Sequence, residues 1–235
     1  MLDFEKGFKQ QIHESWWEPM KPIIESKEVY DIYEYLKAES SRGIKITPKH
    51  DCVFKSFQVN LDELKVVVKG LDGYPQIYKG KHYANGRAFC CENYGKVSPS
   101  LEKLREGWID DCKYTTYNKN NLSLKYLEDQ GVMLTNAGLC TEKDKPGKYV
   151  KLWYPFWKRV YEDIFSKKQD LIFIFLGKEA QRYEKLTVPF YHYSLKTEHP
   201  VAASYTNRDW IHNNVFTKTN KLLQEQHKQP IQWLI

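Results

Sequence analysis

Three side chains that could act together in a hydrolysis reaction follow short apolar runs of the sequence: Asp72, Asn136 and His199. A carboxylate can orient a water molecule, an amide can read the edge of a planar ligand, and an imidazole can donate a hydrogen bond to a developing anion. Taken singly, an Asp in a Gly-rich turn, an Asn after a strand and a His before Pro are more often structural residues. Their shared position after predicted strands favours function.

The elements that position these residues follow from the hydrophobic pattern. Apolar runs predict four strands, and periods of three and four predict helices between them. Short strands alternating with helices indicate an α/β fold with a central four-stranded, mainly parallel sheet flanked by helices, and ligands bind such sheets at the carboxyl ends of the strands. The predicted strands are Leu64–Lys69, Val132–Leu134, Asp170–Leu176 and Tyr191–Lys196, and the predicted helices lie within 8–40, Tyr149–Phe165, Glu179–Leu186 and Val215–His227.

The composition narrows the class of protein. The 235 residues predict a single domain, 1–235, with an N-terminal helical extension over 1–43, and the net charge of +6 agrees weakly with a polyanionic partner. No apolar run approaches the roughly 20 residues of a membrane span, and the charged N-terminus is unlike a signal peptide. We therefore expect a cytoplasmic or nuclear protein that is not secreted. The five cysteines include no CxxC pair, so we expect no metal centre. The GxxxxGK[ST] motif is absent, so we expect no nucleotide cofactor.

Longer motifs around the three residues resemble those of family-1 uracil-DNA glycosylases. VVVKGLDGYP (66–75) resembles the water-activating GQDPYH motif, VMLTNAGL (132–139) the base-reading strand LLLNAVL, and EHPVAAS (198–204) the HPSPLS loop. The resemblance runs in order over most of the chain, and its further matching segments are Ile46–Phe57, Ala84–Cys90, Ser98–Glu102 and Phe216–Trp233.

The resemblance implies a monofunctional DNA glycosylase that flips a pyrimidine nucleotide out of the DNA and leaves an abasic site. By position, Asp72 corresponds to the carboxylate that orients the hydrolytic water, and His199 to the donor that hydrogen-bonds O2 of the departing base. Phe89 corresponds to the aromatic ring that stacks on the base, and Asn136 to the amide that reads it. The family's chemistry needs no cofactor.

The resemblance also implies the contacts with DNA, single- or double-stranded. Loops that pinch phosphates are expected at Ser98 and Ser100, at Lys178 and around Ser204, because hydroxyls, backbone amides and a lysine suit phosphate oxygens. Relatives typically act as monomers, and no contact with a membrane is expected.

The departures from the family lie at the base pocket and at the intercalating loop. Leu71 replaces the motif's Gln, Gly73 its Pro and Pro75 its His, whereas Tyr74, which blocks the 5-methyl group of thymine in the family, is retained. The intercalating Leu corresponds to Ala203, so we expect another wedge, for which the candidates are Tyr205, Arg208 and Trp210.

Three hypotheses about function follow. Replacing Pro by Gly next to Tyr74 frees the backbone, so the pocket could accept a pyrimidine with a bulky 5-substituent, such as the hydroxymethylated or glucosylated bases of phage DNA, in an antiviral defence. The alternative is an ordinary uracil-DNA glycosylase of base excision repair. A third is a non-catalytic DNA-binding or processivity scaffold, although such a scaffold has no reason to keep both Asp72 and His199.

Overall fold

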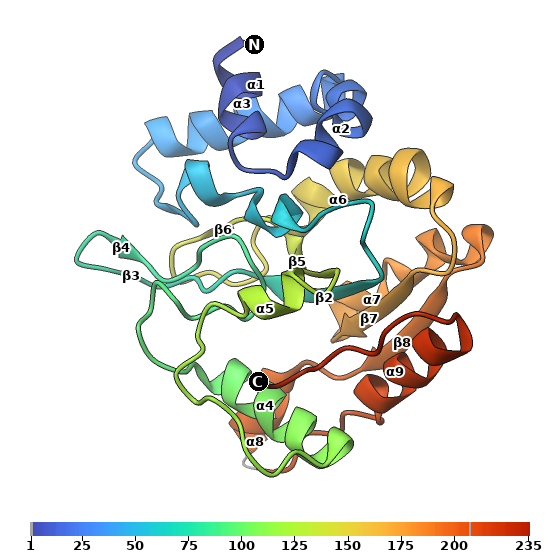
Figure 1. Ribbon diagram of the computed structural model, residues 1–235. Helices are drawn as coiled ribbons and strands as arrows, with labels where there is room; N and C mark the ends of the chain where they lie inside the picture. The colour runs from blue at the N-terminus through green and yellow to red at the C-terminus, as the bar shows by residue number, and fades with distance from the viewer. Residues whose placement is uncertain (1, 207) are drawn as a thin grey trace.

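A central sheet with helices on both faces organises the molecule (Figure 1). The computed structural model describes the backbone of residues 2–206 and 208–235, and the side chains of these residues apart from those at positions 2–4, 204 and 206. Helix α6 and the N-terminal helices cover one face of the sheet, and α4 and α9 cover the other. Among the described residues, no helix is both long and apolar enough to cross a membrane.

The sheet has the predicted four strands, and all of its neighbouring strands run parallel. The strand order is β5-β2-β7-β8, formed by Val132–Gly138, Val66–Asp72, Ile172–Leu176 and Tyr193–Thr197. The three strands β5, β2 and β7 read as near-continuous apolar runs because helices cover both faces. The predicted α/β architecture with a parallel sheet is confirmed.

Strands β2 and β5 extend beyond their predicted ends. The sequence predicts that the strand Leu64–Lys69 stops at Gly70, but β2 continues to Asp72 because its last residues pair with β5, where Gly70 lies opposite Asn136 and Asp72 opposite Gly138. Strand pairing between distant segments therefore overrides the local breaking tendency of glycine. The extension places two of the predicted functional residues on the sheet itself.

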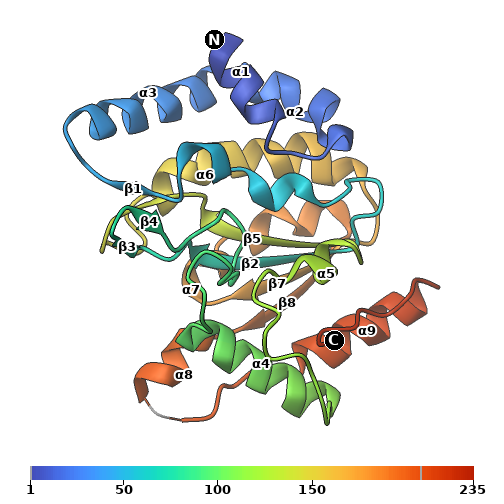
Figure 2. The same ribbon diagram turned by 60° about the vertical axis from the view of Figure 1, so that its left-hand side comes forward.

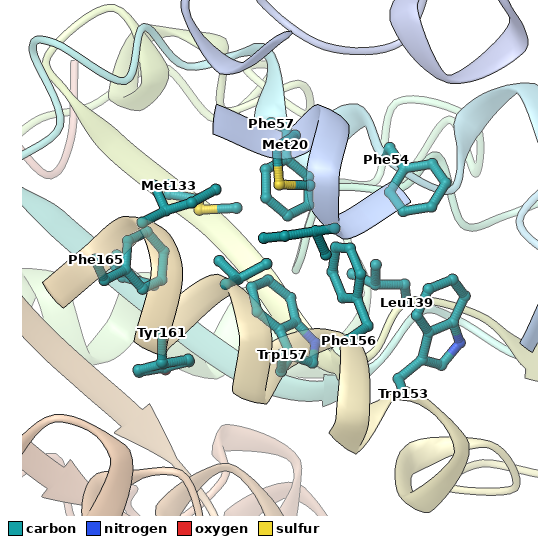
Figure 3. Close-up of a cluster of buried hydrophobic side chains, with 14 of the residues drawn as sticks. Met20, Phe54, Phe57, Met133, Leu139, Trp153, Phe156, Trp157, Tyr161 and Phe165 are labelled. Atoms are coloured by element: carbon teal, nitrogen blue, oxygen red, sulfur yellow. The ribbon is translucent and has the colours of Figure 1, made fainter. Parts of the chain in front are cut away.

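The face under α6 is packed with aromatic rings. Figure 3 shows part of this core, in which Trp157 from α6 lies close to Phe57, with ring centroids 5.7 Å apart. Met20 from the N-terminal helices is completely buried in the same cluster. The predicted extension therefore shares its core with the sheet; its helices are α1 (Leu2–Lys9), α2 (Trp17–Ile24) and α3 (Lys27–Ser41), and α6 spans Val150–Arg159.

The opposite face of the sheet carries a second buried cluster, which includes Phe89 and against which Tyr74 packs. This cluster joins Val66 and Val68 of β2 to Trp108 of α4, Phe216 of α9 and Trp233 of the C-terminal tail. Trp108 and Trp233 stack with centroids 6.3 Å apart. The helices on this side are α4 (Pro99–Cys112), α5 (Lys125–Glu128) and α9 (Val215–Glu225).

Smaller elements depart from the predictions. The helix predicted over Tyr149–Phe165 changes into a π-helical turn at Val160–Ile164, and the one predicted over Glu179–Leu186 is reduced to α7, Lys178–Gln181, followed by 3₁₀ turns. A loop predicted after Asp72 contains a hairpin, and the segment after His199 is helical. The remaining elements are β1 (Ile46–Thr47), β3 (Ile77–Tyr78), β4 (Lys81–His82), β6 (Thr141–Glu142) and α8 (Pro200–Thr206).

Candidate active site

The predicted functional residues meet at the carboxyl edge of the sheet. Asp72 ends β2, Asn136 lies near the end of β5, and His199 follows β8 and directly precedes α8. Figure 2 turns this edge toward the viewer, with the β3–β4 hairpin above it and α8 below. These residues therefore lie at the edge of the sheet where parallel α/β folds bind ligands.

Gly70 forms the floor between two predicted base-binding side chains. A Cβ atom at Gly70 would lie 2.7 Å from Oδ1 of Asn136 and 3.3 Å from the ring of Phe89. Both distances are shorter than an ordinary carbon contact, so only glycine lets the amide and the ring approach the strand this closely. The buried Asn136 amide has no hydrogen-bond partner among the described residues, so it is available to a ligand.

Asp72 is held by a main-chain donor. The N–H of Gly147 donates a hydrogen bond of 2.5 Å to Oδ2 of Asp72. Burial raises the pKa of Asp72 to about 6, and the Gly147 hydrogen bond opposes that rise because it favours the carboxylate. At pH 7 the group is mainly ionised, but it is far more basic than an exposed aspartate.

His199 is partly buried, and its imidazole is neutral. Burial lowers the pKa of His199 to about 4, because the imidazolium would lose its hydration. The N–H of Val201 donates a hydrogen bond of 3.2 Å to Nδ1 of His199. Since Nδ1 accepts, the single proton of the neutral ring must lie on Nε2, which is therefore a donor.

Glycine also shapes the approach to His199. Gly177 has φ of +90°, and a Cβ atom there would lie 2.9 Å from Cβ of His199. The N–H of Gly177 donates to the carbonyl of Thr197, which ties the end of β7 to the end of β8. A side chain at this position would displace the imidazole.

Phe89 lies beside the imidazole in a strained backbone conformation. Its φ is +63°, an uncommon value for an aromatic residue and one found at positions that the surrounding structure fixes. Its ring centroid lies 5.8 Å from that of His199. The preceding N–H, from Ala88, donates to the carbonyl of Leu134 on β5, so the segment that carries Phe89 is attached beside β5.

Tyr74 is fixed by its hydroxyl group. The hydroxyl lies 2.6 Å from Oγ of Ser98 and 3.3 Å from Oγ of Ser100, and it donates to the carbonyl of Phe89 at 3.1 Å. Burial raises the pKa of Tyr74 well above its ordinary value. The ring is therefore anchored at its tip to α4 and to the segment that carries Phe89.

The predicted phosphate-binding serines have structural partners. Oγ of Ser98 caps α4 by accepting from the N–H of Leu101, and both Ser98 and Ser100 are buried. Their hydroxyls are thus engaged with Tyr74, and what remains for a phosphate is the backbone at the start of α4. Lys178, at the start of α7, is exposed and forms no ion pair with the described residues.

The three residues predicted as intercalating wedges, in the segment after His199, differ in exposure and in their partners. Tyr205 is 84% exposed on α8, whereas Trp210 is buried, so Trp210 cannot intercalate as the structure stands. Arg208 makes two hydrogen bonds to the carboxylate of Glu198, at 2.7 and 2.5 Å, and a role at a phosphate would require breaking this pair. Ser204 lies in α8, and its side chain is outside the described part of the structure.

Some contributors to the site carry no signal in their residue type. The Gly147 and Val201 amides orient the two ionisable groups, but a backbone donor can belong to almost any residue. The contact of the basic loop Lys143–Lys148 with Asp72, through the N–H of Gly147, was not predicted. Leu71, predicted at the base, is half-buried and packs against the core on the α6 side of the sheet. Within the described residues, no group of three His, Cys, Asp or Glu side chains could hold a metal ion.

The chain is similar to known proteins over nearly its full length. A curated uracil-DNA glycosylase of Pseudomonas aeruginosa is 30% identical over 225 residues, which cover 95% of this chain and 94% of the relative. A uracil-DNA glycosylase of Exiguobacterium sibiricum is 28% identical over 226 residues, 95% of this chain and all of the relative. The crystal structure of mimivirus uracil-DNA glycosylase superposes with a TM-score of 0.83 at 22% identity, covering 99% of this chain and 91% of that one. No family model matches the sequence.

Proposed function

The chain belongs to the uracil-DNA glycosylase family and is a DNA glycosylase, and we propose that the base it releases is uracil. The observation that carries the proposal is the pairing of an ionised carboxylate, Asp72, with a neutral imidazole, His199, at the edge where Asn136 and Phe89 meet. The rest of the proposed mechanism follows from the protonation states of these two groups.

The base is proposed to bind between Phe89 and Asn136. Its planar ring stacks on the aromatic ring, and its edge hydrogen-bonds to the free amide. As the bond between C1′ of the sugar and N1 of the base breaks, the bonding electrons leave with the base. Negative charge then grows on O2, where Nε2–H of His199 donates a hydrogen bond that strengthens in the transition state.

Asp72 is proposed to act on the sugar side. The sugar becomes oxocarbenium-like, and the nearby negative charge of the carboxylate stabilises it. A water molecule then adds to C1′ and gives its proton to the carboxylate, whose raised pKa suits it to accept one. The departed base anion then takes up a proton from the solvent, Asp72 releases the proton that it accepted, and the products are the neutral free base and an abasic site.

Tyr74 favours uracil over a pyrimidine with a bulky 5-substituent. Because its hydroxyl is tied to Ser98 and to the Phe89 carbonyl, the ring is restrained despite the neighbouring glycine. Gly73 has a packing reason of its own, since a Cβ atom there would lie 2.9 Å from Cβ of Ala84. The glycine thus permits a close approach of two segments, and neither the contacts nor the relatives support the enlarged-pocket hypothesis.

For the grip on DNA, we propose that Lys178 and the backbone amides at the start of α4 contact phosphates. Tyr205 is our candidate for the intercalating wedge because it is the exposed aromatic residue of α8, close in sequence to His199. Arg208 is proposed to brace the loop through Glu198, and Ser204 stays a predicted phosphate contact.

The experiment that tests the function measures base release from oligonucleotides containing uracil, thymine, cytosine or glucosylated 5-hydroxymethylcytosine. Release of uracil alone is expected. The Asp72→Asn variant should lose about 10³-fold in the single-turnover rate while retaining DNA binding. Asp129→Asn, at an exposed carboxylate on the surface, is the matched control. Release of the glucosylated base would refute the proposed specificity, and full activity of Asp72→Asn would refute the mechanism.

A further inference from the structure

A small hairpin projects from the edge of the molecule that holds the candidate active site (Figures 1 and 2). It consists of β3 and β4, which pair antiparallel with Ile77 opposite His82. It starts five residues after Asp72, and its base is fixed because the carbonyl of Pro75 accepts a hydrogen bond of 3.0 Å from the N–H of Asp144. The hairpin is therefore anchored to the loop that also orients Asp72.

The hairpin and its surroundings carry positive charges that are not neutralised. Lys79 and Lys81 are exposed, and neither forms an ion pair with any described residue. The same holds for Lys96, before α4, and for Lys148, beside the loop that contacts Asp72. Many other surface lysines in the structure pair with a carboxylate three or four positions away along the chain. The surface formed by these four lysines therefore attracts an anion more strongly than a surface of paired lysines does.

The tip of the hairpin has a lysine where the turn favours another residue. Lys79 and Gly80 have φ of +48° and +75°, which is the pattern of a two-residue turn that prefers Asn-Gly or Asp-Gly. A lysine in this conformation costs about 1 kcal/mol relative to glycine. The geometry of the turn does not favour a lysine at this position. We therefore look for the reason for the lysine in its positive charge.

Aromatic rings lie among these charges. Nζ of Lys79 lies 5.4 Å from the ring centroid of Tyr78, which is 61% exposed, and Nζ of Lys96 lies 4.9 Å from that of Tyr94. Tyr94 in turn packs against Tyr83 with centroids 4.2 Å apart. Cations interleaved with exposed rings suit a nucleic acid, which offers phosphates and flat bases, better than an acidic peptide.

The chain length limits how far the hairpin reaches. Seven residues separate Asp72 from Lys79, so their Cα atoms lie at most about 25 Å apart. Phosphates along one strand of B-DNA follow one another at a rise of about 3.4 Å. The tip therefore lies within about seven nucleotides of a nucleotide bound at Asp72.

We propose that the β3–β4 hairpin binds the sugar–phosphate backbone of DNA beside the flipped nucleotide, through Lys79 and Lys81. The inference rests on the proposed function for the position of the DNA, but it concerns a surface outside the base pocket. The hairpin adds to the grip of the loops around Ser98, Lys178 and Ser204, and its contacts are with phosphates, so they carry no base specificity.

The test compares two double variants with the unchanged chain. In the first, Lys79→Asn and Lys81→Gln remove two charges, and the asparagine suits the turn, so the hairpin is retained. In the second, Lys21→Gln and Lys27→Gln remove two exposed charges from the N-terminal helices. Binding to an undamaged 30-bp duplex is measured by fluorescence anisotropy between 50 and 300 mM NaCl.

The hairpin variant is expected to lower the slope of log Kobs against log [NaCl] by about 1.8, since each lost phosphate contact removes about 0.9. If these contacts vanish at 1 M salt, affinity at 0.1 M falls by up to about 60-fold. An unchanged slope, or an equal fall in the control variant, would overturn the proposal. Because this DNA contains no uracil, the outcome is independent of base release, which Asp72→Asn tests separately.

Discussion

Replacing Lys69 by methionine should make the protein more stable, and by an amount that depends on pH. Lys69 lies in β2 next to Gly70, on the side of the sheet away from the base pocket, and is completely buried. Its Nζ lies 3.2 Å from the ring centroid of Trp157, a residue labelled in Figure 3, and 4.6 Å from that of Tyr183. No described residue accepts a hydrogen bond from it.

Two effects compete at this amine. The aromatic rings attract a cation by about 2 kcal/mol when it is desolvated. Removing the ammonium ion from water costs several kcal/mol, and no carboxylate compensates because the nearest titratable groups, Tyr161 and Tyr183, are themselves neutral with raised pKa values. Desolvation outweighs the attraction of the rings, so burial lowers the pKa of Lys69 well below 10.5 and favours the neutral amine in the folded protein.

The sign and the magnitude follow from linkage. The unfolded chain carries a protonated lysine below pH 10, so it binds one more proton than the folded chain and the free energy of unfolding rises with pH. The slope is about 1.36 kcal/mol per pH unit. Between pH 7 and pH 9 the Lys69 contribution therefore changes by at most about 2.7 kcal/mol, which is reached when the whole range lies above the pKa of Lys69 in the folded protein.

Lys69→Met keeps a flexible unbranched side chain and removes the ionisable group. Urea unfolding at pH 7, 8 and 9 should show the variant to be more stable at pH 7, with an advantage that shrinks as the pH rises, by up to about 1.36 kcal/mol per pH unit. Lys221→Met, at an exposed position on α9, controls for the general effect of removing a lysine. An advantage that does not change with pH would refute the reasoning, because it would mean that the aromatic cage holds a charged lysine.

Three further predictions concern the site. The single-turnover rate of uracil release should rise from pH 5 to 7 with a midpoint near 6, because only ionised Asp72 is active, and a rate that is flat over this range would exclude the carboxylate. Gly70→Ala should weaken binding of a uracil-containing oligonucleotide at least tenfold by displacing the Asn136 amide, whereas Gly7→Ala, whose added Cβ meets no atom within 4 Å, should bind normally. Tyr205→Ala should slow release from duplex DNA about tenfold more than from single strands if the ring is the wedge, and equal effects would exclude that role.

The sequence predicted the four strands and the residues that follow them, because apolar runs and their breaks are local signals. It could not predict that Gly70 and Asp72 belong to β2, since their pairing with β5 depends on residues more than sixty positions away. Lys69 was read as the polar end of a strand, and only the extended sheet shows it to be buried. The predicted role of Ser98 overlooked its bond to Tyr74, which joins two segments distant in sequence.

The hairpin was overlooked for a related reason. The segment around Tyr78 has Gly and Tyr residues that predict a loop, and its two-residue strands are too short to give a periodic pattern. The site depends on the strand order of the sheet and on the loops that converge at its carboxyl edge. Both are properties of the folded chain, and no short window of the sequence contains them.

Both proposed catalytic side chains take their orientation from main-chain N–H groups, Gly147 for Asp72 and Val201 for His199. A main-chain donor survives any substitution that preserves the path of the loop, proline excepted. The residues of these loops can therefore be substituted during evolution while the two reacting side chains keep their orientation. Divergence of this kind weakens the match to a family model before it changes the orientation of the reacting groups. This agrees with a chain that no family model matches but that retains the fold.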